Sequence, residues 1–156
     1  MPGATTDQSI HALSIQRSIV IAAPPQTVFD ALLDELGPES VMPDGVPFPM
    51  IIEPRPGGRW YRDLGNDAGH LWGHVQVIKP PTLLEITGPL FMSYAAASHV
   101  QWRLKTEDDR TRLTVTHTAI GLIEDEHREG VSEGWDYNLQ RVLEIAEGRT
   151  SDLHKR

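Results

Sequence analysis

Residues 124–147 read EDEHREGVSEGWDYNLQRVLEIAE, and this stretch decides the fold of the chain. Apolar residues recur in it at steps of three and four, the spacing that places side chains on one face of an α-helix. The residues of that face are Val131, Trp135, Leu139, Val142, Leu143 and Ala146. The stretch therefore predicts one long helix whose broad apolar stripe has to be buried against another layer.

Gly130 and Gly134 lie in the first half of this predicted helix. Each glycine costs a helix ~1 kcal/mol relative to alanine. Two explanations are open: the helix begins later than residue 124, or another part of the backbone approaches it closely at these positions.

A sheet is the predicted partner of the stripe, because residues 13–120 hold repeated short β-type runs and only one other helix pattern. Residues 13–21 show the two-residue period of a half-buried strand. Turn sequences such as Pro56-Gly57-Gly58 separate the later runs. The further predicted strands are residues 50–53, 58–63, 69–78, 83–88, 98–106 and 110–120. The sequence thus predicts an α+β fold in which a curved, seven-stranded antiparallel sheet wraps around a long C-terminal helix.

A short helix and a loop are predicted between the first two strands. Pro24 and Pro25 end the first strand and suit the first turn of a helix, and Gly37 suits the C-terminal cap of that helix. Residues 37–49 contain four prolines and are expected to form a loop over one end of the sheet. Residues 89–94 are strongly apolar without a clear period, and a lid is one interpretation of them.

Length and composition predict one cytoplasmic domain. A chain of 156 residues is the size of a single domain, which we place at residues 13–148 between tails 1–12 and 149–156. The absence of cysteine excludes disulfides and thiolate metal sites. Residues 1–9 lack the apolar run of a signal peptide, and no stretch reaches the ~20 apolar residues of a membrane span. The net charge of −8, with scattered basic residues, argues against a nucleic-acid partner.

Ring side chains are the main candidates for a ligand pocket, because an indole offers a flat apolar wall and one N–H donor. Trp135 is the strongest candidate, since it lies on the helix face that meets the sheet. The other candidates are Trp60, Trp72, Phe91, Tyr94, Trp102 and Leu139. Any one of the tryptophans can equally be an ordinary core residue.

His117 is predicted to point inward from the last strand. There an imidazole could hold a ligand carbonyl or act as a general base near neutral pH. The simpler interpretation is a buried histidine whose hydrogen bonds are satisfied by a backbone carbonyl or a water molecule. We therefore include His117 among the cavity candidates and assign it no catalytic role.

No catalytic, metal or cofactor residue is assigned from the sequence. His70 and His74 lie in a predicted strand, where four residues span ~13 Å, so they cannot share one ion. An inward Arg59 or Arg62 could bind a carboxylate or enolate, but such residues more often cover a solvated sheet face. Nucleophile elbows, phosphate loops and dinucleotide fingerprints are absent from the sequence.

Four short motifs follow one another along the chain: residues 56–60 (PGGRW), 73–81 (GHVQVIKPP), 111–117 (TRLTVTH) and 133–135 (EGW). Together they resemble the START-like SRPBCC superfamily, most closely the branch related to the activator of the large heat-shock-protein ATPase. The resemblance covers residues 13–147. It implies a helix-grip fold, as in START and Bet v-like domains, with a cavity for an apolar ligand between the sheet and the long helix. Members of the superfamily include lipid carriers, polyketide cyclases and co-chaperones, so the fold alone does not choose a function.

Three functions therefore compete. The first is non-enzymatic binding of a hydrophobic or aromatic small molecule in the cavity. The second is an enzyme of the polyketide cyclase, dehydratase or hydrolase kind, in which His117, Arg59 or Tyr94 orients an enolisable substrate. The third is a co-chaperone-like protein interaction through the apolar residues 90–94, a surface that could equally form a homodimer.

Overall fold

The computed structural model describes residues 7–154 and confirms the predicted α+β, helix-grip architecture. Seven strands form one antiparallel sheet in the order β1-β7-β6-β5-β4-β3-β2. The elements are β1 (His11–Ile21), α1 (Pro25–Glu35), β2 (Ile51–Ile52), β3 (Arg59–Gly65), β4 (Ala68–Lys79), β5 (Leu83–Gly88), β6 (Ala96–Glu107), β7 (Arg110–Gly121) and α2 (Asp125–His154). Neither helix is long and apolar enough to cross a membrane.

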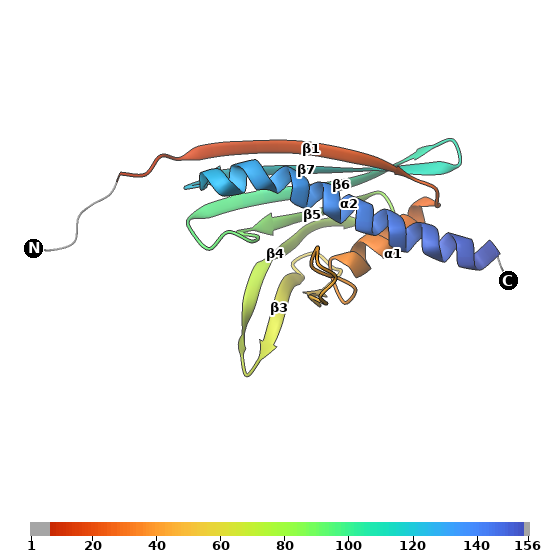
Figure 1. Cartoon of the computed structure of the whole chain (residues 1–156), viewed down its shortest axis with the longest axis horizontal. Helices are drawn as coiled ribbons and strands as arrows, with labels where there is room; N and C mark the ends of the chain where they lie inside the picture. Colours follow the sequence, from red (N-terminus) through yellow and green to blue (C-terminus); the bar gives the residue numbers. More distant parts are fainter. Residues whose placement is uncertain (1–6, 155–156) are drawn as a thin grey trace, which may run out of the picture.

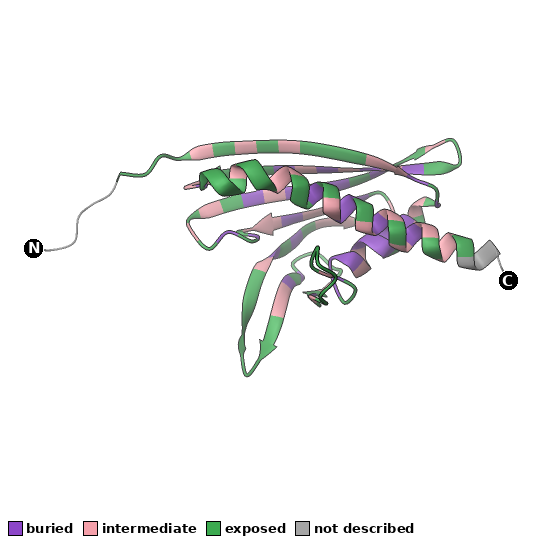
Figure 2. Cartoon of the chain, in the orientation of Figure 1, coloured by how far each residue is buried: buried purple, intermediate pink, exposed green. Residues whose placement is uncertain are grey.

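The core lies where α2 and α1 pack on one face of the sheet. Figure 1 shows α2 crossing that face, with α1 beside its C-terminal half. Figure 2 shows that the buried positions of α2 recur along the side that meets the sheet and α1. The strand alternation predicted from the sequence is confirmed, because the buried side chains of β6 and β7 are Ser98, Val100, Trp102, Leu104, Thr111, Leu113, Val115, His117 and Ala119.

The strands β3 and β4 bend away from the rest of the sheet (Figure 1). Two glycines allow the close strand contact beside this bend. A Cβ on Gly88 would lie 2.5 Å from the Cα of Gly73, and a Cβ on Gly73 would lie 2.6 Å from the carbonyl oxygen of Thr87. Leu90 N–H then donates to the carbonyl of Trp72 at 2.8 Å. Leu90 is therefore held beside β4.

The two ends of the domain differ from the prediction. β1 begins at His11 rather than at residue 13, and α2 continues to His154, so residues 149–154 are helix and not a tail. Arg149 holds this extension, because its guanidinium bonds to Asp34 of α1 and to Glu39 in the loop that follows α1. The sequence pattern did not predict this extension, because the apolar residues that mark the helix end at Ala146. Ion pairs, which stabilise the helix beyond that point, leave no apolar period in the sequence. Residues 1–6 and 155–156, which belong to the predicted tails, lie outside the described residues.

Gly88→Ala is expected to lower the free energy of unfolding by roughly 1–3 kcal/mol, because its Cβ would meet the backbone of β4. The backbone φ of +155° at this position adds strain for any residue with a Cβ. Gly148→Ala in α2 is the control, since a Cβ there meets nothing within 4 Å and should stabilise the helix by ~0.5–1 kcal/mol. Urea unfolding of both variants measures the difference. Wild-type stability in Gly88→Ala would contradict the tight strand contact.

Candidate functional site

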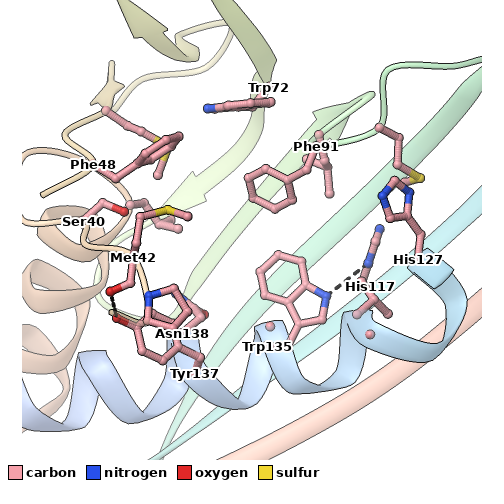
Figure 3. A pocket seen from close by; sticks show the side chains of 18 of the residues that line it. Ser40, Met42, Phe48, Trp72, Phe91, His117, His127, Trp135, Tyr137 and Asn138 are labelled. Carbon is pink, nitrogen blue, oxygen red and sulfur yellow. Dashed lines mark hydrogen bonds between the residues drawn. The ribbon is translucent and has the colours of Figure 1, made fainter. Parts of the chain in front are cut away.

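A cavity of about 570 Å³ lies between the sheet and the N-terminal half of α2. Its walls come from the loop after α1, from β3 and β4, from residues 90–92 and from α2. Figure 3 shows Met42 and Phe48 on one side, Trp72 and Phe91 on another, and Trp135 with Asn138 rising from α2. The volume falls in the range of ~300–1,000 Å³ that is typical of small-molecule sites.

Aromatic rings form most of the apolar wall. The ring of Phe91 packs against Trp60 and Trp72, with centroid distances of 5.7 and 5.1 Å. Trp60 is itself fixed, because its Nε1–H donates to the carbonyl oxygen of Leu36 at 2.7 Å. Phe48 and Tyr137 add two further rings. A wall of this kind favours a flat, apolar ligand, because ring faces stack well on one another.

The face of α2 that borders the cavity follows the helical period, but glycines occupy two of its positions, so no side chain projects there. The cavity-lining residues of this helix include His127, Gly130, Val131, Gly134, Trp135 and Asn138. Of the two explanations for the glycines, the late helix start is wrong because α2 begins at Asp125. Close backbone approach is also wrong, because a Cβ on Gly130 or Gly134 meets nothing within 4 Å. The missing side chains instead leave room beside the helix, and that room is part of the cavity.

His117 lines the cavity with both ring nitrogens engaged. Trp135 Nε1–H donates to His117 Nδ1 at 3.1 Å, so Nδ1 is the unprotonated nitrogen (Figure 3). The proton of the neutral ring therefore lies on Nε2, which is 2.9 Å from Ser98 Oγ. Burial lowers the pKa of His117 from 6.5 to about 4, so the ring is neutral at physiological pH. It serves as a satisfied wall residue that positions the indole of Trp135.

A buried carboxyl group borders the same cavity. Glu35, at the end of α1, is 5% exposed, and its Oε2 accepts a hydrogen bond from Asn138 Nδ2 on α2. Asn138 Oδ1 accepts in turn from Trp102 Nε1 at 3.1 Å. Burial is the main cause that raises the pKa of Glu35 from 4.5 to about 8, against smaller opposing effects of Asn138 and Arg141. Glu35 is therefore mainly a neutral carboxylic acid at pH 7.

Five of the predicted candidates border the cavity: Trp60, Trp72, Phe91, His117 and Trp135. Whether they contact a ligand stays a prediction. Trp72 also carries a buried Nε1–H that has no hydrogen-bond partner within the described residues. This donor is available to an acceptor atom that enters from outside the chain.

The other three candidates do not border the cavity. Trp102 is fully buried behind Trp135, with their rings 5.7 Å apart, so Trp135 separates it from the open space. Leu139 lies one helical turn beyond Trp135, where it is buried in the main core with residues of α1. Tyr94 is drawn to the start of α2, because its hydroxyl lies 2.5 Å from His127 Nδ1 and accepts from the N–H of Glu124.

The structure does not support two residue assignments made for the other functions: Arg59 in a cyclase-like site, and residues 90–94 as a protein-interaction surface. Arg59 is exposed and pairs with Glu53 at 2.8 Å, so it does not face the cavity. Leu90 and Met92 are buried, so residues 90–94 do not form a continuous exposed apolar patch, and Phe91 is half exposed beside the cavity rings. Among the side chains that the structure describes, in residues 7–151, the acidic and histidine residues form no group of three or more that could hold a metal ion.

Sequence reasoning missed Glu35 and Asn138. Both occupy positions where the helical period calls for an apolar residue. Glu35 follows Val28 and Leu32 on the buried face of α1, and Asn138 follows Val131 and Trp135 on α2. A polar residue at an apolar position of a helix stripe was the signal that could have found them.

These features define a helix-grip domain with a ligand-sized cavity between the sheet and its long helix. The model of the family described as Activator of Hsp90 ATPase homolog 1-like protein matches residues 22–147. The chain therefore belongs to this family, within the SRPBCC superfamily.

Solved structures share the fold at low sequence identity. An uncharacterised protein from Rhizobium leguminosarum is 17% identical over 91% of this chain and 99% of that chain, with a TM-score of 0.72. CalU16 from Micromonospora echinospora is 20% identical over 97% of this chain and 92% of its own, with a TM-score of 0.61. DynU16, from the dynemicin biosynthetic locus, is 16% identical over 86% of this chain and 47% of its own, with a TM-score of 0.63. A comparison with functionally curated proteins gave no significant match.

The two buried titratable groups predict how stability depends on pH. Between pH 4.5 and about 8 the folded protein keeps a proton on Glu35 that the unfolded chain has released, so stability falls as the pH rises. Between about 4 and 6.5 the unfolded chain binds the proton that folded His117 excludes, so this group acts in the opposite direction. Above pH 6.5 the Glu35 effect remains. From pH 6.5 to 8 we expect a net loss of roughly 1 kcal/mol, because the slope due to Glu35 diminishes near its folded pKa and the last of the His117 effect opposes it.

Glu35→Gln should remove this loss, because an amide keeps the bond to Asn138 and does not titrate. Asp30→Asn, at an exposed position of α1, should retain it. Urea unfolding at the two pH values measures the free energies of unfolding. Equal declines in wild type and Glu35→Gln would contradict the assignment of the loss to Glu35.

Proposed function

We propose that the protein binds a hydrophobic, aromatic small molecule in the cavity between the sheet and α2, without chemical turnover. The observation that carries this proposal is the cavity of about 570 Å³ bordered by aromatic rings, with the exposed Gly130 and Gly134 at its edge on α2. A helix that only served as core would gain stability from alanine at both positions. Glycine at both positions keeps this edge of the cavity open to a ligand.

Binding is favoured over catalysis by the state of the polar side chains. Both nitrogens of His117 are engaged, and Arg59 and Tyr94 lie away from the cavity. The residues named for a cyclase-like reaction therefore do not converge on one ligand atom, as positioned catalysis requires. One relative of similar structure, DynU16, comes from a biosynthetic locus. This supports a test with aromatic products of biosynthesis as ligands.

A ligand panel tests the proposal directly. Thermal unfolding is measured with polyketide-like aromatics, flavonoids, sterols and fatty acids, and native mass spectrometry is used to detect co-purified ligand. A ligand at a hundred times its Kd stabilises the folded protein by ~2.7 kcal/mol, which shifts Tm by roughly 5–10 °C for a domain of this size. We expect such shifts with uncharged aromatic compounds. A flat panel with no bound mass would contradict the proposal.

Gly134→Leu is expected to abolish binding of any panel hit, because the new side chain projects into the empty part of the cavity. Gly148→Leu is the matched control: it makes the same substitution in the same helix, also where a Cβ meets nothing within 4 Å, but at a position that does not border the cavity. Calorimetric titration should give at least a tenfold weaker Kd for the first variant and an unchanged Kd for the second. Equal affinities would place the ligand elsewhere.

A further inference from the structure

The charges around the cavity restrict the class of ligand. Within the described residues, the cavity lining includes two carboxyl side chains, Glu35 and Glu126, and contains no lysine or arginine. A carboxylate ligand would lose its hydration in this site and meet two carboxyl side chains, with no lysine or arginine in the lining to pair with it, which is costly. The lining therefore disfavours anionic ligands such as fatty acids and favours uncharged ones.

The hydrogen bonds around Glu35 determine which of its two carboxyl oxygens is bonded within the chain and which is free. An indole N–H is a donor only, so the bond from Trp102 Nε1 identifies the oxygen of the Asn138 amide. The NH₂ of Asn138 then points at Glu35 Oε2 and donates to it. The second carboxyl oxygen, Oε1, makes no hydrogen bond with residues 7–151 and is not one of their fully buried unpartnered atoms, so it is accessible from the cavity that Glu35 borders.

The proton of the carboxylic acid is consequently placed on Oε1. Oε2 accepts from Asn138, and a neutral carboxyl carries its single proton on the other oxygen. Burial keeps this proton bound at neutral pH by raising the pKa of Glu35 to about 8. An O–H donor that faces an apolar cavity loses its water partner when a ligand fills the space, so it gains from an acceptor atom on that ligand.

We propose that Glu35, held in place by Asn138, is the group that orients the ligand, and that the ligand is an uncharged aromatic compound whose carbonyl oxygen accepts a hydrogen bond from the Glu35 carboxyl. This inference rests on the proposed binding function and specifies its ligand class. The aromatic body lies among the rings of Phe91, Trp72 and Trp135, and the carbonyl points toward the end of α1. The site should prefer a ketone to the other two ligand classes. A hydrocarbon leaves the O–H donor of Glu35 unpaired, and a carboxylate brings an unpaired charge.

Three probes of nearly equal shape test this inference: methyl naphthyl ketone, ethylnaphthalene and naphthoate. Calorimetric titration of the wild-type protein should rank them in that order. We expect the ketone to bind roughly three- to tenfold more tightly than the hydrocarbon, and naphthoate to bind the most weakly.

Two variants of Glu35 separate its donor role from a packing role. Glu35→Leu should remove the preference for the ketone over the hydrocarbon. Glu35→Gln should keep it, because an amide N–H replaces the acid O–H while the bond to Asn138 is retained. Asp30→Asn, at an exposed position of the same helix, should bind all three probes like the wild type. Urea unfolding of each variant verifies that it is folded before titration.

The pH dependence of the Kd for the ketone distinguishes a hydrogen-bond donor from a packing residue, because a purely packing role of Glu35 would make the Kd independent of its ionisation. Raising the pH to about 9 ionises Glu35 and removes its donor, so the ketone affinity of the wild type should fall toward that of the hydrocarbon. Arg141 acts on Glu35 through its charge, and His117, Glu126, His127 and Tyr137 are the other titratable groups of the cavity. Glu35→Gln keeps all of these groups, so a pH-independent affinity in this variant assigns the effect to Glu35.

The outcomes distinguish a failure of the Glu35 role from a failure of the proposed binding function. Equal affinities for ketone and hydrocarbon, unchanged in Glu35→Leu, would overturn the role of Glu35 and leave the proposed binding function intact. Tightest binding of naphthoate would overturn the inferred ligand class. A failure of all three probes to bind would overturn the binding function and, with it, the inference that rests on it.

Discussion

The structure depends on one packing constraint: a single long helix has to cover a curved sheet of seven strands. The C-terminal half of α2 meets this demand with Leu139, Val142 and Ala146, which are buried with α1 in the main core. The N-terminal half has no such neighbour, and glycines replace apolar side chains on the same face. The core is therefore filled at one end of the helix and open at the other. The cavity is a consequence of how α1 and α2 share the sheet.

The junction between the filled and the open half carries the unusual chemistry. Glu35 ends α1 at this junction, and the amide of Asn138 links it to Trp102 in the core. A buried acid of this kind lowers stability at neutral pH, because folding keeps it protonated where the unfolded chain ionises. Natural sequences depart from good packing mostly at functional positions. The cost is explained if the acid serves the cavity and not the fold.

His117 differs from Glu35, because its hydrogen bonds are all made within the chain and it stabilises the cavity wall. Its bonds to Trp135 and Ser98 join α2 to β7 and β6 and hold the indole of Trp135 at the cavity edge. A neutral ring with both nitrogens engaged stabilises this wall and is not available for proton transfer. The same network thus explains why a histidine lies inside an apolar cavity without a catalytic partner.

The sequence by itself determined the strands, the two helices and the faces of β6 and β7, because alternation and helical period are local properties of the chain. Five of the eight candidates that it offered for the cavity border this space, and their contact with a ligand stays a prediction. The sequence ranked Trp135 first, but it also kept Trp102 and Leu139 as candidates, and neighbouring side chains cover both of these residues. Only the tertiary structure decided which inward positions are core and which border open space. It also brought Glu35 to Asn138 across most of the chain, because burial and pKa depend on neighbours that are distant in sequence.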